Sequence, residues 1–140
     1  MKTSIAISTE AIVSTLLAET ALRHHLSADR PPLLTRDQTQ ALLCLAEGEA
    51  AAIAAATGAA VSPSGDDVGI LTLEMEIPAT ISAPTVRLLI EKTVASRIAA
   101  TAYAGVCSRT ASAATSQAAE TLAALRSLLS APATIVPSRI

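Results

Sequence analysis

Few residues in this chain have the types and spacing that catalysis or metal binding requires. The adjacent pair His24 and His25 is the first candidate for a metal site. Consecutive side chains on a helix point about 100° apart, so the two imidazoles are poorly placed to coordinate the same ion. No nearby carboxylate or cysteine stands at the i,i+4 spacing of helical metal ligands. We therefore expect a polar helix end here, and no metal, cofactor or catalytic residue in the chain.

Two carboxylates, Glu74 and Glu76, lie two residues apart and would share one face of a strand. Such a pair resembles a general acid–base couple, but charged residues also keep an exposed sheet face soluble and discourage edge aggregation. We expect the second role. The serines lack the G-x-S-x-G of a nucleophile elbow, and no Ser, His and Asp pattern indicates a triad. The five glycines are scattered, so neither a P-loop nor a dinucleotide fingerprint is present.

Alanine dominates the composition, with 31 of the 140 residues, whereas Phe and Trp are absent and Tyr103 is the only aromatic residue. A buried alanine methyl contributes far less than the roughly 1.5–3 kcal/mol of a buried Leu or Ile. Close helix packing or a partner subunit would compensate, because alanine contacts let helix axes approach. One aromatic ring offers almost no stacking platform, so we expect no sequence-specific nucleic-acid partner.

Neither a membrane span nor a secretion signal is expected. The longest uncharged run, residues 50–65, is mainly alanine and is shorter than the roughly 20 strongly apolar residues that a span needs. Polar residues interrupt the stretch after Met1 and Lys2 where a signal peptide would have its apolar core. In an intracellular chain, Cys44 and Cys107 are most simply free, buried thiols.

Local patterns predict a single α+β domain, predominantly helical: a four-helix bundle with a small antiparallel β-sheet. Ser8 or Thr9 is expected to cap the first helix, Thr35 and Gln38 have capping-box spacing for the second, and Gly58 ends that helix. The expected elements are helices over residues 9–26, 35–57, 84–107 and 110–130, a strand over 69–77 and an extended tail over 133–140.

The expected strand alternates apolar side chains with polar ones that include Glu74 and Glu76. A lone strand needs a partner for its backbone groups. The β-branched tail, residues 133–140, is the preferred partner, either from the same molecule or from a neighbouring one, and the segment Ala59–Ser62 is the alternative. Residues 1–8 are expected to be irregular or weakly extended.

Charges are unevenly distributed along the chain, although the formal net charge is only −2. Residues 58–84 carry four acids and no base, whereas residues 85–140 carry six bases and two acids. Ordinary solvated charge within one subunit explains this pattern. Between subunits, the same pattern would favour a head-to-tail ring or stack.

Five segments follow one another in a recognisable order: a lead into a helix (Ile7–Ile12), a capped second helix (Leu34–Thr39), a loop into an alternating strand (Asp67–Ile77), the opening of a long helix (Ser82–Leu89) and a basic end (Pro137–Arg139). In this order the chain resembles the small virion structural proteins of tailed phages and prophages of gut bacteria, in the style of head-tail connector or tail-completion subunits. The resemblance implies self-association or docking into a phage ring, without a catalytic residue.

We therefore expect a non-enzymatic assembly subunit whose partners are itself, as a homo-oligomer or ring, and other virion proteins, with no membrane and no specific nucleic acid. It would occupy the host cytoplasm during assembly and then the virion, or otherwise the cytoplasm. Two other possibilities stay open: a cytoplasmic helical adaptor or regulatory protein-interaction domain, and an enzyme fragment whose active site lies in a partner. The expected contact residues are Asp66, Asp67, Glu74, Glu76, Ile135, Val136 and Arg139.

Overall fold

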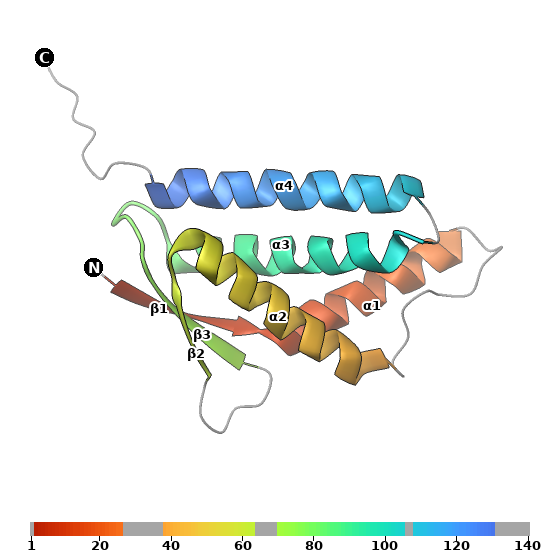
Figure 1. Ribbon diagram of the computed structural model, residues 1–140, viewed down its shortest axis with the longest axis horizontal. Helices are drawn as coiled ribbons and strands as arrows, with labels where there is room; N and C mark the ends of the chain where they lie inside the picture. Colours follow the sequence, from red (N-terminus) through yellow and green to blue (C-terminus); the bar gives the residue numbers. More distant parts are fainter. Residues whose placement is uncertain (1, 27–37, 64–69, 106–107, 131–140) are drawn as a thin grey trace, which may run out of the picture.

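The computed structural model describes residues 2–26, 38–63, 70–105 and 108–130. Four helices and a three-stranded antiparallel sheet make up this part of the chain, which confirms the predicted α+β, mainly helical fold (Figure 1). In chain order the elements are β1 (Lys2–Ser8), α1 (Thr9–Leu26), α2 (Thr39–Thr57), β2 (Ala60–Pro63), β3 (Ile70–Glu76), α3 (Ala83–Tyr103) and α4 (Ser108–Ser130).

The sheet has the order β1-β3-β2, so the predicted strand, β3, lies in its centre. Its alternation holds as expected: Leu73 and Met75 are buried, whereas Glu74 and Glu76 are exposed. On β1, Ile5 faces the same side as its partner Leu73, so the two strands bury one common face.

The preferred partner for β3 was wrong, and the alternative is confirmed. β2 covers most of the segment Ala59–Ser62 and pairs with one edge of β3, while β1 pairs with the other edge from Ser8 opposite Ile70 to Lys2 opposite Glu76. Both edges of β3 are therefore occupied, which leaves none for the tail; residues 133–140 themselves lie outside the described part. The expectation for residues 1–8 was also too weak, because most of them form β1.

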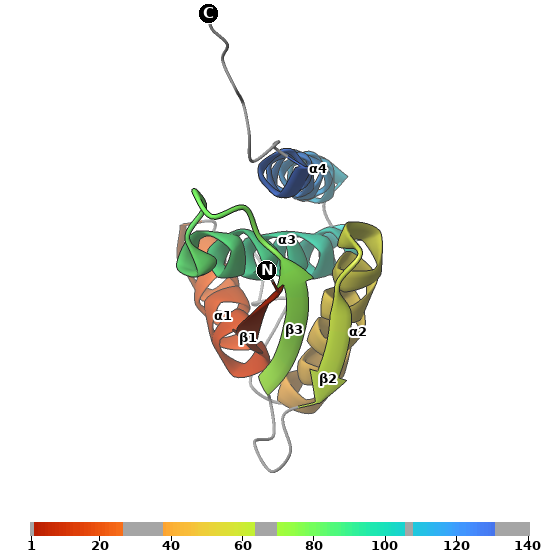
Figure 2. The same ribbon diagram turned by 90° about the vertical axis from the view of Figure 1, so that its left-hand side faces the viewer.

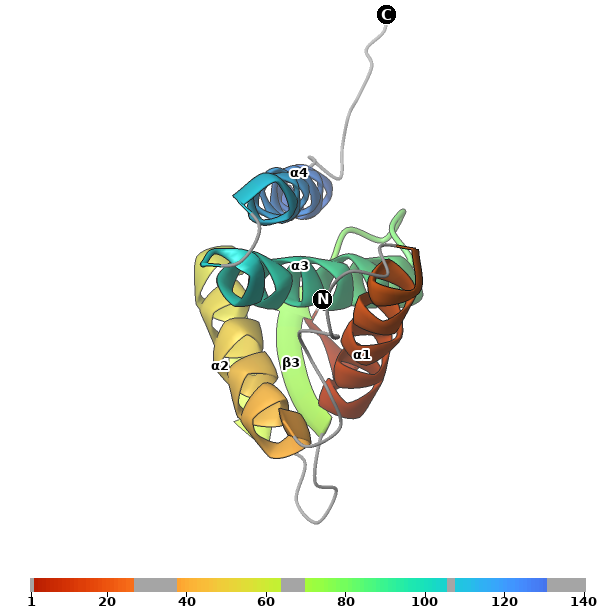
Figure 3. The ribbon, with the colours of Figure 1, turned by 90° about the vertical axis from the view of Figure 1, so that its right-hand side faces the viewer.

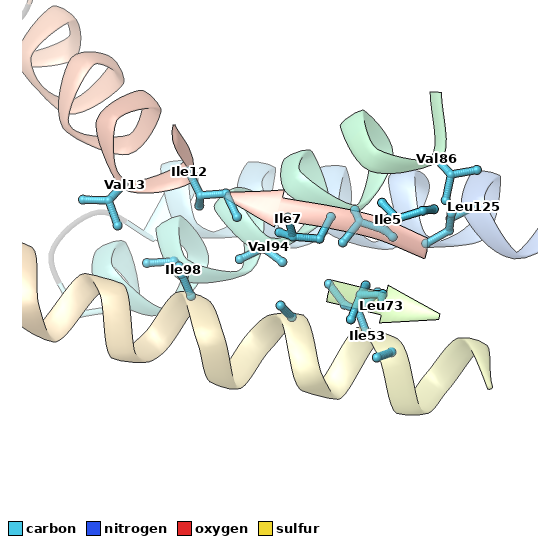
Figure 4. Packing of buried hydrophobic residues seen from close by; sticks show 14 of the residues in the cluster. Ile5, Ile7, Ile12, Val13, Ile53, Leu73, Val86, Val94, Ile98 and Leu125 are labelled. Carbon is cyan, nitrogen blue, oxygen red and sulfur yellow. The ribbon is translucent and has the colours of Figure 1, made fainter. Parts of the chain in front are cut away.

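Three helices, α1, α2 and α3, pack against the inner face of the sheet, and α4 lies beyond α3 (Figures 2 and 3). α1 and α2 flank β3 on opposite sides. α3 runs across both of them and separates them from α4, the outermost helix. The core between sheet and helices is aliphatic, and Figure 4 shows Ile7, Val94 and Leu73 within it. The largest fully buried apolar side chains are Ile7, Leu16, Ile53, Leu73, Ile90, Leu125, Val86 and Val94.

α4 is attached almost entirely through α3. Its buried positions are three alanines and one large residue, Leu125, which is 0% exposed. Small side chains allow the two helix axes to lie close together. A polar contact adds to this packing, because the buried Thr93 Oγ1 of α3 lies 2.7 Å from Thr121 Oγ1 of α4 and 2.7 Å from the Leu89 carbonyl oxygen.

Side-chain caps account for where two helices begin. The Ala11 backbone N–H donates to Ser8 Oγ at 3.2 Å, which starts α1 at the expected residue. The Ser8 backbone N–H in turn donates to Glu91 Oε2 of α3 at 3.2 Å. This carboxylate takes the place of the Glu that a capping box would supply from within the helix. The Thr85 backbone N–H donates to Ser82 Oγ at 3.4 Å and starts α3.

Other helix limits differ from the expected ones by a few residues. α2 begins at Thr39, and the expected cap Thr35 lies outside the described residues. Gly58 ends α2 as predicted, with a left-handed φ of 78° and a backbone N–H directed at the Ala54 and Ala55 carbonyls. α3 stops at Tyr103 rather than near residue 107, and α4 starts at Ser108 rather than residue 110.

Candidate interaction surfaces

The predicted contact residues are only partly placed by the structure. Glu74 and Glu76 project from the outer, helix-free face of the sheet, where both are exposed. The other five lie outside the described residues, so the structure brings no cluster together from the predicted set. These five are Asp66, Asp67, Ile135, Val136 and Arg139.

The candidates for metal or thiol chemistry are placed in part. His24 and His25 lie in the last turn of α1, and their side chains are outside the described part. Among the residues that the structure describes, no three His, Cys, Asp or Glu side chains gather as metal ligands would. Cys44 is a free cysteine, but the expectation that it is buried was wrong: it is exposed, because it lies on the side of α2 that faces away from the core. Cys107 lies outside the described residues.

A groove of about 400 Å³ lies where α2, α3 and α4 meet. Two of its lining residues form an ion pair, in which Arg97 Nε lies 2.9 Å from Glu49 Oε2. This buried oxygen accepts no well-aligned hydrogen bond. The hydroxyls of Thr101 and Thr115 donate to carbonyls of their own helices, at 3.1 and 2.9 Å. The remaining lining residues are Ala100, Ala118, Ala119 and Leu122.

This groove has a volume in the range of small-molecule sites, about 300–1,000 Å³. Its two charged side chains, Glu49 and Arg97, are already paired with each other. The hydroxyl groups of Thr101 and Thr115 donate their protons to backbone carbonyls of their own helices. The walls are mostly methyl groups, so the groove could accommodate an apolar group but offers no unpaired charge or reactive side chain. The ion pair joins α2 to α3, and residues so far apart in the sequence could not be paired from local patterns.

The outer face of α2 is the most unusual surface of the described chain. Leu42, Ala46 and Ile53 on the inner side are fully or almost fully buried, yet the opposite side is also apolar. Leu45 is 47% exposed there, and Glu47 is the only charged residue on the exposed side. The α2 outer face consists of Ala41, Cys44, Leu45, Gly48, Ala51, Ala52 and Ala55, all exposed.

A helix that is apolar on all sides is normally buried on all sides. The residue pattern of α2 contains this signal, since residues 50–56 hold six alanines and one isoleucine and no polar residue. In the sequence, that pattern argues against a membrane span but does not distinguish the two faces of the helix. Only the packing of α2 on α3 and on the sheet shows which side lacks a partner.

Comparison of the chain with protein-family models, with curated proteins and with solved structures finds no match. Over the described residues, none of the helices combines the length and the apolar character needed to cross a bilayer.

Proposed function

We propose that this chain is a non-enzymatic assembly subunit that acts by self-association or by docking on other proteins. The observation that carries this proposal is the α2 outer face, an apolar helix side with no partner in the described chain. Burying Leu45 alone against a partner would contribute about 1–2 kcal/mol for the exposed part of its side chain. An assembly role needs such a surface and needs no reactive group.

The side chains of the α2 outer face suit a helix as partner. Alanine, glycine and cysteine have short side chains, so a second helix can approach with its axis close to that of α2. Ala41, Cys44, Gly48, Ala51 and Ala55 recur at alternating steps of three and four residues, the spacing of a seam between two helices. With 19 residues, α2 is about 28 Å long, enough for several turns of contact.

Our proposal places the assembly in a phage or prophage particle, with a head-tail connector or tail-completion role. The support for this part is the order of segments along the chain, from the lead into the first helix and the capped second helix to the alternating strand, the long helix and the basic end. On this proposal the partners are further copies of the chain and other virion proteins. The chain would then reside in the host cytoplasm during assembly and in the virion afterwards.

Substitution of one exposed leucine tests the proposal directly. Leu45→Glu places a charge in the α2 outer face without touching the core, because Leu45 is already exposed. Leu88→Glu is the matched control, since Leu88 is 59% exposed on α3, away from this face. Molar mass would be measured by light scattering from micromolar to millimolar concentration, with circular dichroism to verify folding.

The expected result is a mass that rises with concentration in the wild type and in Leu88→Glu and rises less in Leu45→Glu. A wild type that remains a monomer throughout would refute self-association. Equal association of all three proteins would refute the role of the α2 outer face.

A further inference from the structure

β1 forms one margin of the sheet, and within the described residues no strand lies beside its outer edge. It is a seven-residue strand with no proline, and Lys2 is its only charged residue. The opposite margin, β2, has four residues and ends at Pro63. Open edges are templates for another strand, and proteins usually block them with charge, proline or short length. β2 has two of these protections, whereas β1 has a single charge at its end.

The direction of the β1 backbone groups follows from one hydrogen bond. The Ser8 N–H donates to Glu91 Oε2, so it does not point toward β3. Alternate residues of an antiparallel strand direct their N–H and C=O groups to the same side. The backbone groups of Ser4 and Ala6 therefore point out of the sheet, and both residues are exposed. Their edge offers two donors and two acceptors to an extended peptide.

We propose that β1 pairs antiparallel with β1 of a second copy of this chain, about a two-fold axis at Ile5. The pairing would join the two three-stranded sheets into one sheet of six strands. It rests on the proposed function, because it assigns to self-association a defined contact that is separate from the α2 outer face. With two separate contact surfaces, dimers can associate further into a larger assembly.

A second copy fits this edge better than the other strand of the molecule does. Centred on Ile5, the pairing sets Ser4 opposite Ala6 of the second copy, and Lys2 opposite Ser8, so no like charges face each other. Each pair of Ser4 with Ala6 exchanges two backbone hydrogen bonds, about four for the dimer. Pairing with β2 of a second copy would span at most four residues and meet Pro63, which has no N–H to donate.

Proline substitution tests whether this edge is used. Ala6→Pro removes an outward N–H that has no role in the β1–β3 pairing, so the monomer keeps its sheet. The comparison is made in a Leu45→Glu background, which weakens association through the α2 outer face. Two donors are lost per dimer, and the expected result is a dissociation constant about 30-fold higher. Val61→Pro is the matched control on β2. By the same alternation its N–H also points out of the sheet, so its dissociation constant is expected to stay at that of the Leu45→Glu background.

Disulfide trapping tests the register independently of any loss of folding. In a Cys44→Ser, Cys107→Ser background, Ser4→Cys and Ala6→Cys are prepared as separate proteins. The Cα atoms of residue 4 and residue 6 of the second copy would lie about 5.5 Å apart, within disulfide range. Identical residues would lie about 8 Å apart, because they are offset by two residues along the strands. Only the mixture of the two proteins is expected to cross-link.

Three outcomes would overturn the proposal. The first is cross-linking of either protein alone, and the second is a mixture that stays reduced while the wild type associates. The third is Ala6→Pro associating as tightly as its Leu45→Glu background. In the last two cases self-association through the α2 outer face stands, whereas a wild type that never associates refutes the proposed self-association itself.

Discussion

Leu125→Ala is expected to weaken the docking of α4 on α3 while the rest of the molecule keeps its stability. Leu125 is 0% exposed and is the only large residue among the buried positions of α4; the others are Ala111, Ala114 and Ala118, each 8–9% exposed. α4 touches α3 along its length and α2 only slightly, and it has no substantial contact with the sheet. Its attachment therefore depends strongly on this one side chain.

The magnitude follows from the burial. Replacing a fully buried Leu with Ala costs about 2.7–5 kcal/mol, with the larger values where the surroundings cannot relax. α4 can move toward α3 to fill part of the space, because its other buried positions are alanines. We expect a loss of about 3 kcal/mol in the free energy of docking α4.

Native-state hydrogen exchange measures this loss for each element separately. In Leu125→Ala, the α4 amides are expected to exchange with a lower opening free energy than the amides of β3. Ile53→Ala is the matched control: Ile53 is equally buried but lies in the core beneath the sheet, so all elements should still open together. If α4 and β3 amides of Leu125→Ala share one opening free energy, α4 is not an independent unit and the reasoning fails.

Three further changes have expected outcomes that denaturant unfolding can measure. Gly58→Ala should lower the free energy of unfolding by about 1 kcal/mol, because Gly58 has a positive φ. Gly48→Ala should raise it by about 1 kcal/mol, because Gly48 lies in a helix with open space around the new Cβ. If both substitutions changed the free energy of unfolding in the same direction, this account would be contradicted. Glu91→Ala should cost about 1 kcal/mol and speed exchange of the Ser8 amide, since the acceptor for that N–H is lost; unchanged exchange would argue against the contact. Thr93→Val should cost about 1–2 kcal/mol because a buried hydroxyl that joins two helices is removed, and a neutral result would show that this contact is dispensable.

The parts of the fold that local chemistry determines could be predicted from the sequence. Ser8 and Gly58 mark helix ends through their own hydrogen bonds and backbone conformation, and each performs the expected role. The alternation around Glu74 and Glu76 placed β3 and its exposed face correctly. These features depend on residues a few positions apart.

The partners of β3 depended on contacts that the local pattern does not contain. β1 holds only two isoleucines, and its serines were interpreted as interruptions of an apolar segment rather than as the polar half of a strand. The tail looked equally extended, and nothing local distinguishes a strand that finds an edge from one that does not. The Arg97–Glu49 pair was missed for the same reason.

The α2 outer face was missed because an alanine-rich helix has no sequence contrast between its two sides. Ala46 and Ala50 are buried and Ala51 and Ala52 are exposed, although the residue type is the same. Only the position of α3 and the sheet decides which of them lie inside. Alanine-rich helices therefore hide their contact surfaces until the tertiary structure is known.

The central place of β3 has a consequence for how the chain acquires its structure. β3 takes one partner from nearby, β2, and the other from the first residues of the described chain, so Ser8 must reach Ile70 across two intervening helices. Closing such a long loop delays pairing, which makes a sheet of this kind form more slowly than a local hairpin. During synthesis β1 would leave the ribosome well before β3 exists. Until β3 emerges, Ile5 and Ile7 would be exposed to any chaperone or nascent neighbour.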